Sequence, residues 1–404
     1  MSKKISYLIL LIALSCVLFA GILFVNWWNQ PLGQPLMIPT QISEPGSSSI
    51  EGDIDIQATA IAQIVETQTA ASTPTETDPE ITDITPTEIE PTPSATPTAT
   101  ITPEPTETPD MGPKPMYILA AGIDTTGPGY YSGLADVIRI VRVDFETPKV
   151  TILTLPRDLW VELPGMAEEY EYITHGKINT AYTHGIPYLG RYKGEGGGPG
   201  LLAHTIAHNY GLVVDHYVVI NMKVFVDVVD ALDGINIYLN RTWDGRADTD
   251  NPDHMAWVFE EGDHHMSGEE ALRFARIRLN YSEITRTDNQ TLVMCAVREK
   301  ITRPNVFSAL PNLVNAFIGR VQTDLSPAQI SKLINLLPKL EPENLLFFRF
   351  PNAMFVQGRE HDPFMDASTF VWDIPIEDAR NFIQDFMQDQ ISIEIGGGGG
   401  RRCP

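Results

Sequence analysis

Basic and amide side chains recur in short, separated motifs of a chain that is acidic overall. They are Arg157, Lys177, Arg276, Arg278, Arg286 and Gln290. Guanidinium groups bind phosphate oxygens bidentately, and a set of cations stabilises the charge that spreads over a transferring phosphoryl group. The motifs are far apart in sequence, so only a folded domain could bring them together. We therefore interpret them as a predicted phosphate site.

Two aspartates stand apart from these motifs and indicate a divalent cation. Asp124 ends an apolar run that begins at Met116, and Asp136 precedes a second apolar run. Paired carboxylates can hold a divalent ion that bridges phosphate oxygens. Asp136 could also accept the proton of an attacking hydroxyl. Each residue has an ordinary alternative, such as an exposed arginine, a solvated helix end or a turn-capping aspartate. Their combination favours a pyrophosphate site.

The charge of the chain excludes a nucleic-acid-binding surface. The net charge is −24, and Lys and Arg are absent between Ile5 and Pro113. Affinity for nucleic acid comes from broad basic faces. Basic residues that are confined to a few loops instead indicate a local anion site.

The first 28 residues have the pattern of a cytoplasmic N-terminus followed by a transmembrane helix. Residues 5–28 are uncharged, and a bilayer core needs about 20 apolar residues. Lys3 and Lys4 precede this run, so the positive-inside rule places all that follows outside the cytoplasm. A cleaved signal peptide is the alternative, but the run is long and lacks a small-x-small cleavage site. A membrane anchor suggests that the pyrophosphate is on a lipid.

Composition divides the rest of the chain. Residues 29–113 are rich in Thr, Pro and Glu and predict a disordered linker, extended at about 3 Å per residue, that could hold the domain away from the membrane. We predict a catalytic domain over residues 114–303 and a helical and strand extension packed on it over 304–395. Residues 396–404 read as a disordered Gly-rich tail.

Strand-like and helix-like patterns alternate from Met116 onward and indicate a layered α/β domain. Strands are expected at 116–122, 137–143, 150–155, 216–220 and 235–239. Helices are expected at 199–210, 222–232, 288–301, 326–337 and 376–387, and a capping box at Ser267 opens one that runs through Ala275.

Cysteines and histidines give weaker signals. Cys16, Cys295 and Cys403 are too few and too scattered for a disulfide framework or a zinc site, and Cys295 is expected to be a small buried hydrophobe. His204 and His208 are four residues apart on an expected helix, and we assign them a surface or packing role.

Taken in order, the motifs resemble those of the LytR–CpsA–Psr family of bacterial cell-envelope proteins over about residues 116–301. Each motif is weak alone, and the ordered set is specific. The resemblance rests on Gly122-Ile123-Asp124, Asp136, Leu155-Pro156-Arg157-Asp158, Lys177-Ile178-Asn179-Thr180-Ala181-Tyr182, Asp215-His216-Tyr217, Val229-Asp230-Ala231-Leu232-Asp233-Gly234-Ile235, Ser267-Gly268-Glu269-Glu270-Ala271-Leu272, Arg276-Ile277-Arg278, Arg286 and Gln290.

The resemblance implies a fold, an activity and residue roles. The fold would be a three-layer α/β/α domain with a central mixed sheet. The activity would move a glycopolymer from a polyprenyl-pyrophosphate carrier to a peptidoglycan acceptor, with the polyprenyl tail in the apolar interior. Asp124 and Asp136 would hold Mg²⁺ or Mn²⁺. The implied catalytic residues are Asp136, Arg157, Arg276 and Arg278, and the implied phosphate-binding residues are Lys177, Arg286 and Gln290.

The chain departs from the family pattern at two positions. Leu134 stands where the family carries an arginine two residues before the second aspartate, and Asn289 replaces the arginine before Gln290. Either Arg139 or Arg191 supplies the missing charge, or the carrier differs, or catalysis is weak. The rival functions are a non-catalytic protein that binds polyprenyl phosphate or wall polymer, and a pyrophosphatase that acts on the same lipid-linked saccharide.

Overall fold

The computed structural model describes residues 28–36, 114–127, 129–246, 257–278, 281–307, 313, 317–391 and 400–403. Residues 1–27 of the expected transmembrane segment, and most of the expected linker, lie outside the described residues. Within the described ranges, no helix combines the length and the apolar character that a membrane span requires.

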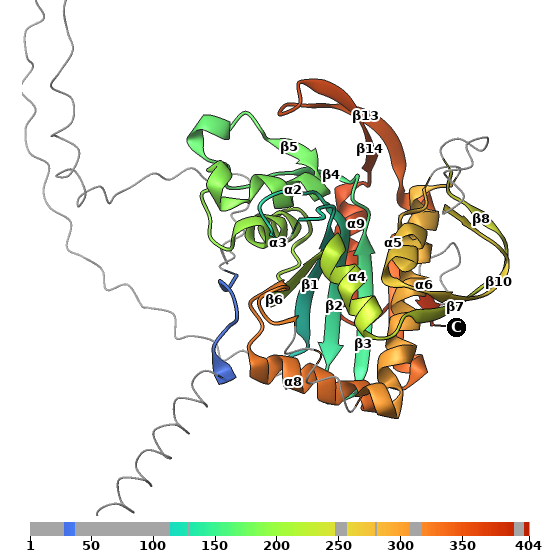
Figure 1. The fold of residues 1–404 in the computed structure, drawn as a ribbon. Helices are drawn as coiled ribbons and strands as arrows, with labels where there is room; N and C mark the ends of the chain where they lie inside the picture. The colour runs from blue at the N-terminus through green and yellow to red at the C-terminus, as the bar shows by residue number, and fades with distance from the viewer. Residues whose placement is uncertain are drawn as a thin grey trace, which may run out of the picture. The chain divides into compact units, whose positions relative to one another are not determined.

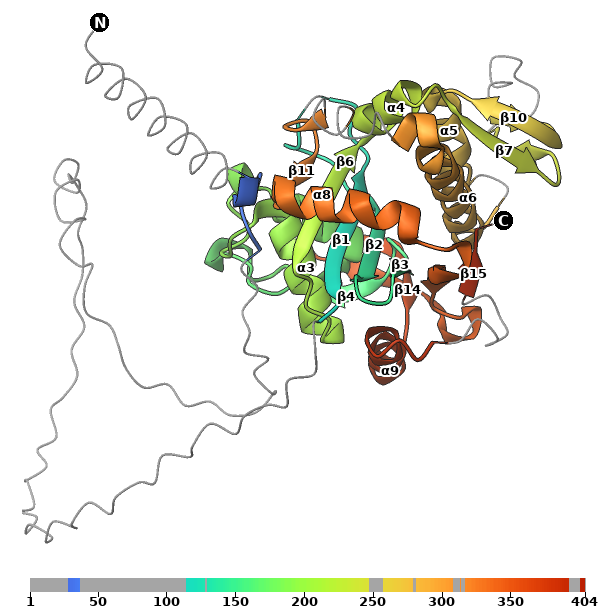
Figure 2. The same ribbon diagram turned by 90° about the horizontal axis from the view of Figure 1, so that it is seen from below.

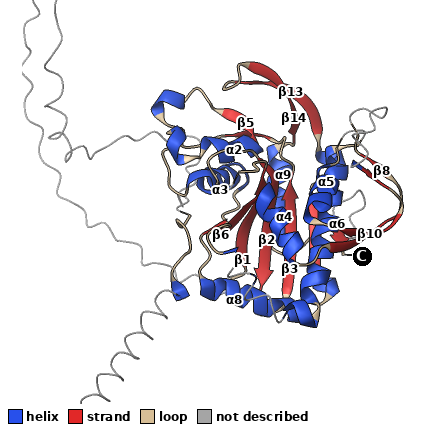
Figure 3. Cartoon of the chain, in the orientation of Figure 1, coloured by secondary structure: helices blue, strands red, loops and turns tan. Residues whose placement is uncertain are grey.

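A seven-stranded mixed sheet forms the centre of the domain (Figures 1 and 3). Its order is β11-β6-β1-β2-β3-β12-β15. The strands are β1 (Met116–Ile123), β2 (Ala135–Asp144), β3 (Lys149–Leu155), β6 (His216–Asn221), β11 (Gln322–Thr323), β12 (Leu345–Arg349) and β15 (Gly400–Arg402). The pairs β1–β6 and β3–β12 are parallel, whereas β1–β2, β2–β3, β6–β11 and β12–β15 are antiparallel. The expected α/β class with a central mixed sheet is confirmed.

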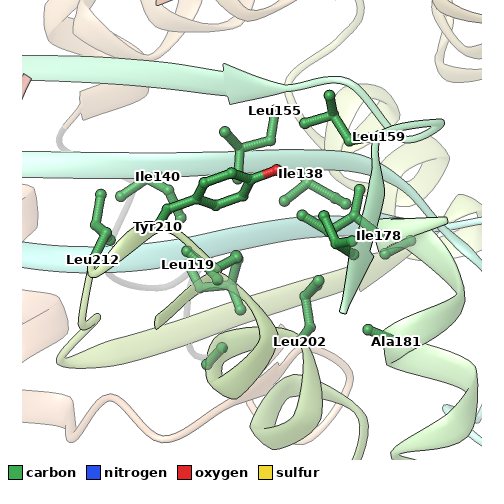
Figure 4. Close-up of a cluster of buried hydrophobic side chains, with 14 of the residues drawn as sticks. Leu119, Ile138, Ile140, Leu155, Leu159, Ile178, Ala181, Leu202, Tyr210 and Leu212 are labelled. Atoms are coloured by element: carbon green, nitrogen blue, oxygen red, sulfur yellow. The ribbon is translucent and has the colours of Figure 1, made fainter. Parts of the chain in front are cut away.

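One face of the sheet carries the main hydrophobic core. The helices on this face are α2 (Ile178–His184), α3 (Gly197–Tyr210) and α9 (Ile376–Met387). Successive side chains of a strand point to opposite faces, so Leu119, Ile138 and Ile140 meet these helices while their neighbours face the other way. Figure 4 shows these side chains packed with Leu202 and Tyr210 of α3.

Other helices cover the opposite face, as the view along the strands shows (Figure 2). They are α4 (Met222–Ala231), α5 (Gly268–Arg276), α6 (Glu283–Thr302) and α8 (Pro327–Leu336). The expected capping box is present at Ser267 and opens α5. A second cluster of buried apolar residues joins α4, α5 and α6 to the ribbon of β7 (Ile235–Leu239) and β10 (Gly262–Met266). Both faces are therefore covered, as a three-layer domain requires.

Shorter strands and 3-10 helices connect the main elements. Two-stranded pairs form between β4 (Trp160–Glu162) and β5 (His175–Lys177), β8 (Trp243–Asp244) and β9 (Val258–Phe259), and β13 (Val356–Asp362) and β14 (Ala367–Asp373). Short 3-10 helices span Glu168–Tyr170, Pro187–Leu189, Leu337–Lys339, Pro342–Asn344 and Asn352–Met354. Residues beyond 303 thus provide β12 for the central sheet and α9 for its core.

The C-terminus corrects two sequence predictions. Part of the expected disordered tail forms β15, which pairs with β12. Cys403 follows this strand and forms a disulfide with Cys295 of α6, with a Cα–Cα distance of 5.4 Å. The expectation that Cys295 is an unpaired hydrophobe was wrong, because a pairing across 108 residues leaves no trace in the sequence spacing.

A segment near the N-terminus, blue in Figure 1, lies against the domain. The amide of Leu32 donates to the carbonyl of Leu325 at 3.3 Å, and the hydroxyl of Tyr217 donates to the carbonyl of Gln34 at 3.1 Å. A Cβ on Gly33 would come within 2.5 Å of the Thr323 carbonyl oxygen, so this close approach requires glycine. Residues 29–36 were expected to belong to the linker, and they are instead part of the folded unit.

Candidate functional site

A large cavity of about 830 Å³ lies between the central sheet and helices α4, α5 and α6. Its apolar wall includes Val137 of β2, Val218 of β6, Phe225 of α4 and Val293 of α6. On β1 the wall is formed by small residues, Ala120 and Gly122. Larger side chains at these two positions would occupy the space between the sheet and the helices, so the sequence of β1 leaves the cavity open.

Polar and charged side chains gather on the same cavity. The predicted site residues that line it are Asp124, Asp136, Arg157, Arg276, Arg278, Arg286 and Gln290. They come from the end of β1, the start of β2, the turn after β3, the end of α5 and the first turns of α6. The ends of these strands and helices therefore bring the charged side chains together on the cavity, next to its apolar wall.

Lys177 is the predicted site residue that does not line this cavity. Its ammonium group donates to Oδ1 of Asp158 at 2.9 Å, and Oδ2 of Asp158 accepts from Nε of Arg157 at 3.3 Å. Lys177 therefore lies one ion pair behind Arg157. In this arrangement it orients the arginine through Asp158.

Asp136 lies at the centre of an ion-pair network. Its Oδ2 accepts from Nη1 of Arg157 at 2.7 Å and lies 3.7 Å from Nη1 of Arg286. Its Oδ1 accepts from the side chain of Asn179 at 3.3 Å. Burial alone would lower the pKa of Arg157, but the carboxylates of Asp136, Glu283 and Asp158 outweigh it and raise that pKa above its usual value.

Glu283 belongs to this network and was missed in the sequence. Its carboxylate accepts from Arg286 and lies 3.7 Å from Nε of Arg157. Burial raises the pKa of Glu283, and the cations Arg286 and Arg157 oppose that shift. Burial likewise lowers the pKa of Arg286 despite Glu283. The only signal in the sequence was an acidic residue one turn before Arg286, which is ordinary for the first turn of a helix.

Arg276 and Arg278 have a different environment. Both are exposed, and the buried Ile277 lies between them. In the described part of the chain, neither guanidinium forms an ion pair or a side-chain hydrogen bond. The alternation places both on the cavity, as expected, and leaves their donors available to a ligand.

Asp124 has the chemistry of a cation ligand and also a structural bond. Its Oδ1 accepts from the amide of Leu134 at 2.6 Å, and its own amide donates to the Leu134 carbonyl at 3.1 Å. Among the described residues, no three His, Cys, Asp or Glu side chains are grouped as metal ligands. Mg²⁺ needs only one or two carboxylates when phosphate oxygens and water complete its shell. Asp124 and Asp136, on one cavity beside several arginines, therefore fit such an ion.

Arg139 and Arg191 were the two candidates to replace the positive charge that the family carries at position 134, and the structure distinguishes between them. Arg139 lines the cavity, as does Leu134. Arg191 does not: its guanidinium lies 4.2 Å from the ring centroid of Phe364 and 3.3 Å from Nδ1 of His184. Asn289, at the second departure from the family pattern, is buried in α6. Arg139 is thus the additional cation of the cavity.

About half of the chain is similar in sequence to known proteins. The chain is 25% identical over 218 residues to the polyisoprenyl-teichoic acid–peptidoglycan teichoic acid transferase TagV of Bacillus subtilis, which covers 54% of this chain and 51% of that protein. It is 28% identical over 228 residues to biofilm regulatory protein A of Streptococcus mutans, covering 55% and 53%. The match therefore spans about half the length of these two relatives.

Solved structures show the same fold. Protein gbs0355 of Streptococcus agalactiae superposes with a TM-score of 0.53 at 23% identity, over 71% of this chain and 92% of that one. The crystal structure of B. subtilis TagV gives a TM-score of 0.51 at 21% identity, over 69% and 99%. The model of the LytR_cpsA_psr family matches residues 84–368, which include the central sheet except β15 and every residue of the site. The chain therefore belongs to the LytR–CpsA–Psr family.

Proposed function

We propose that this protein is a membrane-anchored, extracytoplasmic phosphotransferase. It would move a glycopolymer from a polyprenyl-pyrophosphate carrier to peptidoglycan or another wall acceptor. The observation that carries the proposal is the juxtaposition of an apolar cavity of about 830 Å³ with a cluster of arginines and two aspartates on its wall. An amphiphile with a long apolar tail and a pyrophosphate head matches both parts.

The charged residues suit the pyrophosphate head. Arg276 and Arg278 have free donors, while Arg157 and Arg286 are held in position by Asp136 and Glu283. Preorganised cations of this kind stabilise charge that develops in the transition state without having to reorganise. The network around Asp136 thus supplies the fixed part of the site, and the two exposed arginines supply an adaptable part.

The proposed step balances without an additional reactant. The oxygen of an acceptor hydroxyl forms a bond to the phosphorus that carries the saccharide, and the bond to the bridging oxygen breaks. Polyprenyl monophosphate leaves, and Arg157 and Arg286 stabilise the negative charge on the phosphoryl group that is transferred. The proton of the hydroxyl passes to Asp136. A divalent cation held by Asp124 and Asp136 would supply further positive charge next to the phosphates.

Three other observations support the proposed carrier, acceptor and location. TagV, which is similar over half of this chain, is named as a transferase from polyisoprenyl-teichoic acid to peptidoglycan. The Cys295–Cys403 disulfide suits an oxidising compartment outside the cytoplasm. The uncharged run over residues 5–28 supports a membrane anchor.

The test uses the full chain in detergent with a short synthetic polyprenyl-pyrophosphoryl saccharide. Release of polyprenyl phosphate is followed with Mg²⁺, Mn²⁺ or EDTA, with and without a peptidoglycan fragment. We expect turnover that needs both the cation and the fragment. Turnover without the fragment would indicate a pyrophosphatase, and tight binding without turnover would indicate a non-catalytic binding protein. Arg303→Ala is the control, because Arg303 pairs with Glu299 at the other end of α6.

A further inference from the structure

Among the described residues that line the cavity, Arg139 is the one arginine on a strand in the middle of the sheet. It belongs to β2, where it faces Ala120 of β1 and Thr154 of β3 in the register. Ala120 and Val137 line the cavity together with Arg139. The position is three residues inward from Asp136, which is about 10 Å along a strand.

This cation is buried and poorly satisfied. Only 1% of Arg139 is exposed. Both terminal nitrogens share one acceptor, the hydroxyl of Thr291, at 3.4 and 3.3 Å, and Nε has no hydrogen-bond partner. A guanidinium has five N–H donors, so most of them are unused.

The surroundings of Arg139 differ from those of Arg157, which is half-buried, and of Arg286, which is buried. Arg157 and Arg286 each contact carboxylates at ion-pair distance. Within the described ranges, no carboxylate comes that close to Arg139, and Asp288 acts on it only at longer range. A buried, unpaired charge is strongly destabilising, so its presence on the wall of a large cavity is best explained by an anion that enters the cavity.

We infer that Arg139 binds the inner, lipid-side phosphate of the carrier, while Arg157 and Arg286 bind the outer phosphate. This inference rests on the proposed carrier, because it assigns a ligand to the same cavity. Thr291 is five residues after Arg286 on α6, so the Arg139 guanidinium lies about 7 Å further along that helix. The two linked phosphates of the carrier would lie at two depths in the cavity. The guanidinium groups also lie at two depths, with Arg139 deeper than Arg157 and Arg286.

The experiment measures binding by the full chain in detergent. The probes are geranylgeranyl diphosphate, geranylgeranyl monophosphate and uncharged geranylgeraniol. In the unmodified protein, we expect the diphosphate to bind at least tenfold more tightly than the monophosphate. In Arg139→Met, the diphosphate should lose about ten- to a hundredfold in affinity, and the alcohol should bind as before. Arg139→Lys should restore part of the loss, because a point charge remains.

A matched control lies on the same strand. Arg142 is on the opposite face of β2, near Asp389, and Arg142→Met should leave all three affinities unchanged. The melting temperature of Arg139→Met without ligand should equal or exceed that of the unmodified protein, because an unpaired buried charge is removed.

Two outcomes would overturn the inference. Undiminished diphosphate binding by Arg139→Met would show that Arg139 does not contact the phosphates. Equal losses for the diphosphate and the alcohol, with a lower melting temperature, would show a packing role. Since binding alone is measured, absence of turnover would refute the transferase while leaving this result interpretable.

Discussion

Nη1 of Arg157 donates to Oδ2 of Asp136 at 2.7 Å, and this ion pair links the adjacent ends of two neighbouring strands. Asp136 lies at the start of β2, and Arg157 follows the end of β3. The two strands are antiparallel, with Ile138 opposite Leu155, so these ends are adjacent. The carboxylate holds the guanidinium in place through this charge-assisted hydrogen bond. The pairing gives the site a rigid element before any ligand binds.

Arg157→Ala is expected to lower the rate of polyprenyl phosphate release about a hundred- to a thousandfold, because a preorganised donor is lost. Arg157→Lys should recover only part of the rate, since an ammonium cannot bind bidentately. The measurement is kcat/KM with the short saccharide substrate. A rate equal to that of the Arg303→Ala control would contradict a catalytic role.

Asp124→Asn tests the cation site. The asparagine retains an oxygen that can accept from the amide of Leu134, so the turn should stay intact while the negative charge is removed. We expect at least a tenfold higher Mg²⁺ or Mn²⁺ concentration for half-maximal turnover and an unchanged melting temperature. An unaltered cation titration would show that Asp124 serves the turn alone.

Leu134→Arg should increase turnover about tenfold. Leu134 lines the cavity next to Asp124, and an arginine there would add a guanidinium at the phosphate site. The comparison is kcat/KM of the variant against the unmodified chain under the same conditions. Unchanged turnover together with unchanged diphosphate affinity would indicate that Arg139 already supplies the positive charge that position 134 lacks.

We expect His184 to make the free energy of unfolding depend on pH. It is buried on α2, where burial and the Arg191 cation lower its pKa from 6.5 to about 4, with Asp362 opposing. The unfolded chain therefore binds a proton at a higher pH than the folded chain. The stabilising contribution is complete above pH 6.5 and is lost as the pH falls toward 4. The shift corresponds to roughly 3 kcal/mol.

Urea denaturation between pH 7 and pH 4 measures this effect. The free energy of unfolding should fall more steeply in the unmodified chain than in His184→Gln. Parallel pH profiles for the two proteins would assign the dependence to other groups.

Breaking the disulfide should loosen the edge of the sheet. Cys403→Ser is expected to lower the free energy of unfolding by about 2–4 kcal/mol, because the unfolded chain is no longer cross-linked. Denaturation with and without reductant provides the measurement. Reductant should destabilise the unmodified chain and leave the variant unaffected. The same response in both proteins would exclude the Cys295–Cys403 bond in solution.

Local patterns in the sequence predicted the strands β1, β2, β3, β6 and β7 and the helices α3, α4, α5, α6, α8 and α9, but not α2, β12 or the short two-stranded pairs. The amphipathic run at 376–387 has the same bounds as α9, because periodicity and the preceding proline both mark them. The strand β15 and its disulfide could not be predicted, since both depend on contacts with residues more than 50 positions away. Long-range pairing of this kind is decided by the packed sheet.

The site could be predicted to a similar degree. Its arginines and aspartates follow strand and helix ends, and such ends meet at one edge of a layered domain. Lys177 was placed on the phosphates because its partner Asp158 is a neighbour only in space. Glu283 was missed because an acidic residue in the first turn of a helix has an ordinary explanation. Burial, which distinguishes it, depends on the tertiary structure.

The contact of residues 28–36 with the domain has a consequence for the segment that follows. The chain touches the folded unit before residue 37 and joins it again at residue 114, so residues 37–113 close a loop on that unit. The separation between the domain and residue 28, which ends the uncharged run, is then set by a short docked stretch of backbone rather than by the length of the loop.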